Sequence, residues 1–421
     1  MLSRGPAKLL LHRDFAIFWA GQSLSAMGDA FAFVALPLLV LEATGSVKQM
    51  GLLTATFGVG HAVTGLFSGA VVDWADRRRL MIACDVARAL LFASVPLTWI
   101  TTGPCIPLLY VVTALGAVLG NLFSVGYVTA TANLVEPSEL TRANSRLQVS
   151  QGLAYVLGPT LAGIVAAKLG PSSAVGVDAL SFVVSAASLL FIRLRRPTSK
   201  RPDEGMFEKL IGGVSFLFRQ PVLRAVTIFL LLTSMLDAGL FDLFIYLVKR
   251  DFGRDDSVVG LVLGIGATGA ILGAVVAPFA RERFGFGVCF LGATALEAAG
   301  MLATTRARSL EVVALGAILF SAAVSIRGIS SISLRQRITP DHLLGRVTSI
   351  FWTLGSAMMP VGAALSTSAA ATYSTRPVIA VCGVLIGAVA LRGLLTPMRQ
   401  AHPEASGDKL LSDELHRANL K

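Results

Sequence analysis

The chain has 421 residues, of which 54% are hydrophobic and only 14% carry a charge, and its mean hydropathy is +0.72. A soluble globular chain carries about 25% charged residues, so this composition excludes an ordinary soluble protein, and the high hydrophobicity excludes a disordered one. The net charge of +11 would suggest a nucleic-acid partner in a soluble protein. Here the basic residues stand in short segments between apolar runs, where they orient a membrane protein, so we expect no nucleic acid as a partner.

Apolar runs long enough to cross a bilayer recur along the whole chain. A membrane-spanning helix needs about 20 mostly apolar residues, and twelve spans with short loops use about 35 residues each, which fits this length. The sequence therefore predicts an all-α polytopic membrane protein with twelve transmembrane helices. The runs lie near residues 15–41, 47–72, 80–101, 106–135, 147–168, 173–193, 223–248, 257–280, 286–304, 310–334, 347–371 and 377–397.

The twelve runs form two sets of six, separated by the longest polar interruption before the C-terminal tail. We expect helical bundles over residues 1–193 and 222–398, a linker over 194–221 and a cytoplasmic tail over 399–421. The linker carries apolar residues at the spacing of an amphipathic helix, which we expect to lie on the inner membrane surface. These residues are Phe207, Leu210, Ile211, Val214, Leu217 and Phe218.

The distribution of Lys and Arg predicts the orientation in the membrane. Most of the 36 basic residues fall in the N-terminal segment, the loops after even-numbered runs and the tail. Cytoplasmic loops carry an excess of Lys and Arg, so we expect a cell-membrane protein with both termini in the cytoplasm. The first run follows a basic segment but lacks a small-residue cleavage site, which favours a retained helix over a signal peptide.

Two short segments recur in the same order in both sets of runs. Gly69-Ala-Val-Val ends the second run and Gly273-Ala-Val-Val ends the eighth, while Asp29 and Asp237 stand in similar settings in the first and seventh. Both pairs share an offset of roughly 200 residues, which indicates two related six-helix halves. Such halves meet around a substrate site near the bilayer midplane in secondary transporters.

A dense charge pattern covers the end of the second run and the start of the third. Gly69 allows close helix contact, and the carboxylate of Asp73 lies at a helix end near basic groups. Asp85 and Arg88 stand three residues apart and share a helix face. This pattern predicts a cytoplasmic charge cluster that stabilises one conformation of the two halves, and the simpler interpretation is anchoring by positive charge alone. The candidate gate residues are Gly69, Asp73, Arg77, Arg78, Asp85 and Arg88.

At this segment the chain resembles the major facilitator superfamily. Gly69–Arg79 is similar to the family's loop signature G-x-x-x-D-R-x-G-R-R, with Trp74 and Asp76 at two positions that depart from it. Further segments resemble the branch of macrolide and siderophore exporters, namely Asp14-Phe15, Trp19-Ala-Gly21-Gln22 and Glu136-Pro137. The resemblance implies two pseudo-symmetric six-helix bundles and transport by alternating access.

The fifth run carries Gly158-Pro159 and, four residues after the proline, Gly163. A proline disrupts the helix ladder, and small residues permit close helix contact. The segment is similar to the family's antiporter motif G-x-x-x-G-P-x-x-G-G, which is associated with limited leakage and with export. Generic packing of small residues is the alternative interpretation.

We single out five charged residues inside the apolar runs: Asp29, Asp237, Asp242, Glu297 and Arg327. A charge near the bilayer centre costs at least about 2.5–3.5 kcal/mol, so it normally faces a cavity or a partner. By the resemblance, the first, fourth, seventh and tenth spans line the central cavity, so Asp29, Asp237 and Arg327 would face it. Glu297 lies on a span that the family places outside the cavity, and we interpret it as a carboxylate that snorkels or pairs with a neighbouring helix.

The fourth run lacks the arginine that many proton-coupled exporters of the family carry. Of its polar groups, we include Asn121 and Tyr127 among the candidate substrate- or proton-binding residues. Asp29 and Asp237 are then the best candidates for binding a transported proton or a cationic group of the cargo. A structural hydrogen-bonding role is the alternative for Asp29.

The sequence contains no P-loop, no metal-ligand spacing and no nucleophile cluster, and its four cysteines stand far apart. We therefore expect no enzyme, cofactor or metal. We expect a monomeric secondary transporter in the lipid bilayer that exports a hydrophobic or amphipathic small molecule, such as an antibiotic, drug or siderophore-like metabolite, by proton antiport. The alternatives are an importer or lipid flippase of the same fold, and a sensor that binds a ligand without transporting it.

Overall fold

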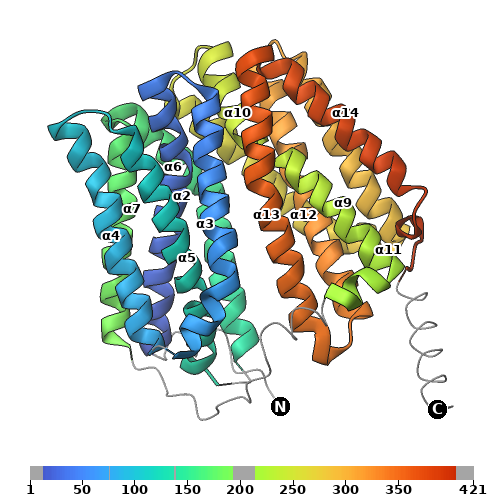
Figure 1. The fold of residues 1–421 in the computed structure, drawn as a ribbon, viewed down its shortest axis with the longest axis horizontal. Coiled ribbons are helices and arrows are strands. Elements are labelled where there is room, and N and C mark those ends of the chain that lie inside the picture. Colours follow the sequence, from blue (N-terminus) through green and yellow to red (C-terminus); the bar gives the residue numbers. More distant parts are fainter. Residues whose placement is uncertain (1–12, 75, 137–138, 193–213, 404–421) are drawn as a thin grey trace. The chain divides into compact units, whose positions relative to one another are not determined.

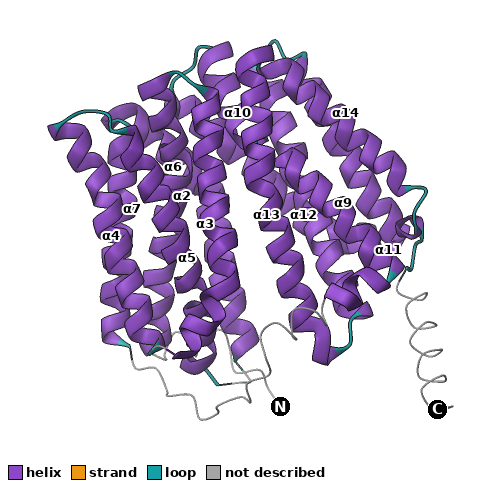
Figure 2. Cartoon of the chain, viewed as in Figure 1, coloured by secondary structure: helices purple, strands orange, loops and turns teal. Residues whose placement is uncertain are grey.

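The computed structural model describes residues 13–74, 76–136, 139–192 and 214–403 (Figure 1). This described part of the chain is helical apart from short turns, and it contains no strand (Figure 2). The all-α prediction is therefore confirmed. Most of the expected linker helix and the tail beyond residue 403 lie outside the described residues.

The chain folds as two compact units. The first contains Met1–Lys200 together with Val248–Gly264, and the second contains Arg201–Leu247 together with Ile265–Lys421. A short segment from the second half of the sequence therefore makes its contacts within the first unit.

Six long helices run through the described part of the first unit (Figure 1). α2 packs against α7 and α6, α4 packs against α7 and α5, and α3 packs against α5. α7 is thus the common neighbour of α2 and α4, which brings polar groups on these three helices together. The bounds are α2 (Arg13–Thr44), α3 (Val47–Trp74), α4 (Arg77–Thr101), α5 (Ile106–Leu134), α6 (Leu140–Leu169) and α7 (Pro171–Phe191).

The second half of the chain is helical as well, and α13 packs against α9 and α14. α11 covers two predicted runs, which meet at a kink in the helix. The kink lies at Gly285, whose φ is 77°. That φ lies in the left-handed region, which glycine enters without the steric penalty of a Cβ. The bounds are α9 (Pro221–Asp237), α10 (Leu240–Tyr246), η1 (Leu247–Asp251), α11 (Asp256–Thr305), α12 (Leu310–Ile338), α13 (Asp341–Tyr373), α14 (Thr375–Gly393) and η2 (Pro397–Arg399).

Each of the twelve predicted runs is helical over most of its length. Within the described ranges, nine helices are long and apolar enough to cross a membrane. Large apolar side chains are exposed on them, including Leu90 on α4, Leu180 on α7 and Leu391 on α14. Soluble proteins rarely expose so much apolar surface, whereas a bilayer covers it.

Aromatic and aliphatic side chains fill the interior of the first unit. Phe15 and Phe18 of α2 are fully buried together with Met81 of α4, in a cluster that Phe123 of α5 joins. Burial of one such side chain contributes about 1.5–3 kcal/mol relative to exposure in water. This packing holds the helices in place, and it thereby determines which charged side chains of the spans lie close together.

Candidate functional site

Asp29 and Arg88 form an ion pair inside the first unit. Asp29 lies in the middle of α2 and Arg88 three turns into α4, and Nη2 of Arg88 donates to Oδ1 of Asp29 at 2.5 Å. The Arg88 side chain is 9% exposed, whereas the Asp29 side chain is 49% exposed. The guanidinium also lies 3.8 Å from the ring centre of Phe182 on α7, an arrangement that stabilises a desolvated cation. The pair thus joins a buried cation to an accessible carboxylate.

Asp178 on α7 is a second carboxylate beside this pair, and it is fully buried. Its Oδ1 atom accepts a hydrogen bond of 3.1 Å from the hydroxyl of Ser181, one turn further along α7. Asp178 lies close enough to Asp29 and Arg88 for both charges to act on it. Sequence analysis did not single out this residue.

Asp85 is a third carboxylate at the same place. It stands one turn before Arg88 on α4, is fully buried and lies beside the hydroxyl of Ser185 on α7. Ser185 accepts a hydrogen bond of 2.9 Å from Nε2 of Gln22, so its own hydroxyl hydrogen is available to Asp85. We call Asp29, Asp85, Arg88 and Asp178 the N-terminal charge cluster.

Small residues bring α2 and α7 close enough to build this cluster. A Cβ atom at Gly28 would lie 2.6 Å from Oδ1 of Asp178, and one at Gly21 would lie 2.6 Å from Cβ of Ser188. Such close approach between membrane helices is typical of small residues spaced along one face. The polar stripe Asp178, Ser181, Ser185 and Ser188 in an otherwise apolar helix is the sequence signal that could have revealed the cluster.

Arg327 binds two carboxylates within the second unit. Nη2 donates to Oδ2 of Asp237 on α9 at 2.6 Å, and Nη1 donates to Oε2 of Glu297 on α11. The side chains are 3%, 14% and 0% exposed in the order Arg327, Asp237 and Glu297. Glu297 is therefore paired with a neighbouring helix. We call these three residues the C-terminal charge cluster.

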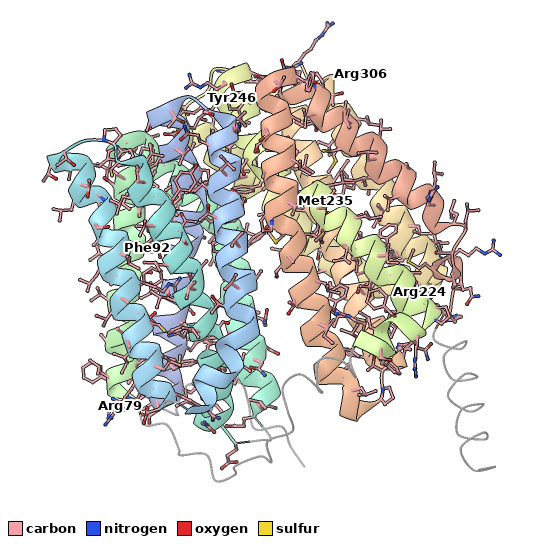
Figure 3. The ribbon with its side chains drawn as sticks, viewed as in Figure 1. Arg79, Phe92, Arg224, Met235, Tyr246 and Arg306 are labelled. Carbon is pink, nitrogen blue, oxygen red and sulfur yellow. The ribbon has the colours of Figure 1, made fainter. Side chains whose placement is uncertain are left out.

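Asp237 lies at a break in the seventh predicted span. α9 ends at this residue, the chain turns at Ala238 and Gly239, and α10 begins at Leu240. A Cβ at Gly239 would lie 3.0 Å from Cβ of Ser366 on α13, so the turn needs glycine for its packing. Met235, two residues before the break, is marked in Figure 3. Discontinuous spans of this kind expose backbone groups that transporters use near the midplane.

The candidate residues on α5, Asn121 and Tyr127, belong to neither charge cluster. Nδ2 of Asn121 donates to the carbonyl of His61 on α3 at 2.9 Å. The ring of Tyr127 lies 5.5 Å from that of Phe18, among apolar side chains. Arg327 stands roughly 200 residues after Asn121, so the two occupy equivalent positions of the repeat with different chemistry.

The candidate gate residues separate into two groups. Gly69 and Asp73 lie on α3, in a part of the helix whose side-chain surroundings are not described. Arg77 begins α4, and Arg78 donates to the carbonyls of Leu189 and Leu190 at 2.7 and 2.5 Å, which caps the C-terminal end of α7. The other two members, Asp85 and Arg88, lie about 12 and 17 Å further along α4 at the helical rise, within the N-terminal charge cluster.

The candidate export motif on α6 lies where other helices approach most closely. A Cβ at Gly158 would clash with Ala30 of α2, and one at Gly163 would lie 2.8 Å from Cα of Gly260 at the start of α11. The hydroxyl of Thr160 donates to the carbonyl of Gly260 at 3.4 Å. Pro159 lies inside this helix, between the two contact points.

A further ionic cluster, which the sequence did not reveal, lies at the end of α2. Nζ of Lys249 on η1 donates to Oε1 of Glu42 at 3.1 Å and also binds the carboxylate of Asp256, which is 6% exposed. We call these three residues the Lys249 cluster. They tie the segment 248–264 to α2 within the first unit.

The matching family model is described as transmembrane secretion effector and covers residues 6–419. The chain belongs to this family of the major facilitator superfamily. The resemblance drawn from Gly69–Arg79 is therefore confirmed, and so is the prediction that the protein is a transporter and no enzyme.

Two characterised relatives match the chain over nearly its whole length. The multidrug efflux pump Tap of Mycolicibacterium fortuitum is 28% identical over 410 residues, which cover 92% of this chain and 95% of that relative. Macrolide efflux protein A of Streptococcus pyogenes is 23% identical over 399 residues, with coverage of 90% and 94%. The similarity to the exporter branch thus extends over both halves.

Solved structures of the same fold include the nucleoside transporter NupG, with a TM-score of 0.74, 11% identity and coverage of 91% of this chain and 98% of that one. A bacterial homologue of the lysosomal transporter Spinster aligns with a TM-score of 0.70 at 13% identity, covering 95% and 98%. These likenesses confirm the twelve-helix fold.

Proposed function

We propose that this transporter exports hydrophobic or amphipathic small molecules, cationic ones among them, in exchange for protons and by alternating access. The cargo binds near the bilayer midplane, and Asp29 receives its cationic group or the exchanged proton. Asp237 and Arg327 are the substrate- or proton-binding candidates of the second half, and Asn121 and Tyr127 are the polar candidates of the fourth span.

The observation that carries this proposal is the half-exposed carboxylate of Asp29 in the middle of an apolar helix. An ionisable side chain at such a depth is costly and is retained where it serves a pathway or a binding site. Its ion-pair partner is the buried Arg88, and the exposed half of the carboxylate remains open to a ligand. Aromatic and aliphatic residues dominate the first and fourth spans, which favours an apolar cargo.

The relatives support the direction and the cargo class. One is named a multidrug efflux pump and the other a macrolide efflux protein, and both match across both halves. We therefore favour export of drug-like or antibiotic-like molecules over import or lipid flipping, and over a sensor without transport activity.

Membrane placement and gating complete the proposal. The excess of basic residues on one set of loops supports a cell-membrane location with both termini in the cytoplasm. We propose that the chain works as a monomer. Gly69, Asp73, Arg77 and Arg78 then lie at the cytoplasmic face, where they stabilise one conformation. Gly158, Pro159 and Gly163 limit leakage by close helix packing.

The test uses inverted membrane vesicles that contain the full chain, with an acid-inside pH gradient and ethidium as the probe. Wild type accumulates ethidium when the gradient is present and stops when an ionophore collapses it. Asp29→Asn keeps the side-chain shape but removes the charge, so we expect at least a tenfold loss of gradient-driven uptake. Glu311→Gln, on an exposed carboxylate in the first turn of α12, is the matched control and keeps full uptake.

Three results would contradict the proposal. Uptake that ignores the pH gradient would exclude proton antiport, and gradient-driven movement out of inverted vesicles would indicate an importer. Binding of ethidium without any flux would favour the sensor.

A further inference from the structure

Four buried polar atoms of the N-terminal charge cluster lack a hydrogen-bond partner among the described residues. They are Nε of Arg88, Oδ2 of Asp178 and both carboxylate oxygens of Asp85, and all four are shielded from solvent. Buried polar groups in native proteins are almost always hydrogen-bonded, so an orphaned donor and an orphaned acceptor in one cluster need an explanation. One explanation is that they serve each other in a second arrangement of the same side chains.

The charge count points in the same direction. The cluster holds three carboxylates and one guanidinium, and Asp85, Arg88 and Asp178 are all buried. A buried carboxylate without a cationic partner is so costly that it takes up a proton instead. Because Arg88 is bound to Asp29, two carboxyls stay without a cation in this arrangement, Asp178 on α7 and Asp85 on α4.

We propose that Asp178 is the proton-binding residue of the first unit, and that Arg88 exchanges its partner between Asp29 and Asp178 as cargo binds and leaves. This inference rests on the proposed function, because it assigns the proton and the cargo to two different carboxylates. Asp29, the accessible carboxylate, receives the cationic group of the cargo, and Asp178, the buried one, holds the proton.

The geometry permits the exchange with a side-chain movement alone. The Arg88 guanidinium lies over Phe182, which is one helical turn from Asp178 on the same face of α7. Gly28 leaves the Asp178 carboxyl directly against α2, next to the position of Asp29. Stacking on Phe182 supports the guanidinium in both positions.

The groups that face Asp178 are few and come from three helices. Asp29 approaches from α2, Asp85 and Arg88 from α4, and Ser181 from α7 itself. The described part of α6, which also packs on α7, adds no charged group to this set. Asp85 is the rival proton carrier, and its neighbour Ser185 is a neutral donor.

The exchange balances charge and protons. While Arg88 binds Asp29, Asp178 is a neutral carboxylic acid. When a cationic cargo takes the place of Arg88 at Asp29, the guanidinium moves to Asp178, whose proton is released to water. Cargo release on the far side frees Asp29 for Arg88, and Asp178 takes up a proton from that side. One cationic group is thus exchanged for one proton, and Arg88 keeps its charge throughout.

Infrared difference spectroscopy on the purified full-length protein tests this assignment without any cargo. The carbonyl stretch of the protonated Asp178 carboxyl should be present in wild type at neutral pH and missing in Asp178→Asn. Asp29→Asn mimics an occupied Asp29, because it releases Arg88, so the same band should be lost there as well. Asp85→Asn is the matched control on the rival carboxylate and should retain the band.

Two results would overturn the proposal. A band that is lost in Asp85→Asn and retained in Asp178→Asn would assign the proton to Asp85, and a band unchanged in Asp29→Asn would show that Arg88 does not exchange partners. If Asp178→Asn does not fold, Asp178→Glu replaces it, and the band must then shift in frequency. The outcome is independent of the vesicle assay, so a failure here differs from a failure of proton-driven export.

Discussion

At the scale of single residues, the two charge clusters differ in how far they are shielded. Arg88 binds one accessible carboxylate, whereas Arg327 binds the largely buried Asp237 and the fully buried Glu297. A cation between two buried anions is held from both sides, and breaking such a pair leaves uncompensated charge. The C-terminal charge cluster is therefore the more structural of the two.

We predict that Arg327→Leu lowers the free energy of unfolding by about 3–5 kcal/mol, because two carboxylates then remain buried without a cation. Thermal unfolding in detergent measures the loss. Arg306→Gln is the matched control, since Arg306 extends away from the helices in Figure 3 and is exposed. Equal unfolding temperatures of the two variants would show that Arg327 does not stabilise the second unit.

Sequence reasoning found most of the charged residues but few of their partners. Asp29, Asp237 and Arg327 stand out because a charge in an apolar run is rare. Arg88 was grouped with Asp85 because residues three positions apart lie on the same face of a helix. Its ion-pair partner is Asp29, which lies 59 residues away on α2. Helical periodicity gives the face on which a side chain lies, but it does not say which helix packs there.

At the scale of helices, the contact between α6 and the start of α11 is built from glycines. Gly163 and Gly260 approach so closely that a Cβ at either one would lie 2.8 Å from the Cα of the other. Contacts of this kind depend on backbone approach, and a larger residue forces the helices apart.

We predict that Gly163→Val destabilises the protein by about 1–3 kcal/mol, the usual cost of overpacking, and reduces export several-fold. Efflux of ethidium from intact cells measures the second effect. Gly152→Ala on the same helix is the matched control, since a Cβ there meets nothing within 4 Å. Normal efflux by Gly163→Val at normal expression would contradict the proposal that close packing of α6 limits leakage.

The Lys249 cluster ties the segment 248–264 to α2. We predict that Lys249→Met costs about 1–3 kcal/mol, because the carboxylate of Asp256 is left buried without its donor. Hydrogen exchange over residues 248–260 should become faster, which mass spectrometry can follow. Lys48→Met, on an exposed lysine at the start of α3, serves as the control, and identical exchange in both variants would argue against the tie.

The helices were predictable because the bilayer requires long apolar stretches. All twelve predicted runs are helical, but the break after Asp237 was not foreseen. The residues around it, Ala238 and Gly239, are compatible with a continuous helix, and the turn becomes necessary only through packing against Ser366 of α13. Such breaks depend on contacts between helices, and the sequence of a single apolar run does not show these contacts.

At the scale of the whole molecule, the repeat relates two halves whose polar centres differ. Asp29 and Asp237 occupy matched positions, but the arginine lies on α4 in the first half and on α12 in the second. The half with the accessible carboxylate and the additional acids is suited to exchange. The half with the closed triad is suited to remain fixed.

The central claim is that cargo export and proton entry are one exchange that passes through Asp29. The most direct test is to count protons in proteoliposomes that contain the purified protein and a pH-sensitive dye in the lumen. When an ethidium gradient is imposed without any pH gradient, wild type should move protons against the ethidium flow, and Asp29→Asn should move none. Ethidium flux through wild type without any change in lumenal pH would contradict the account.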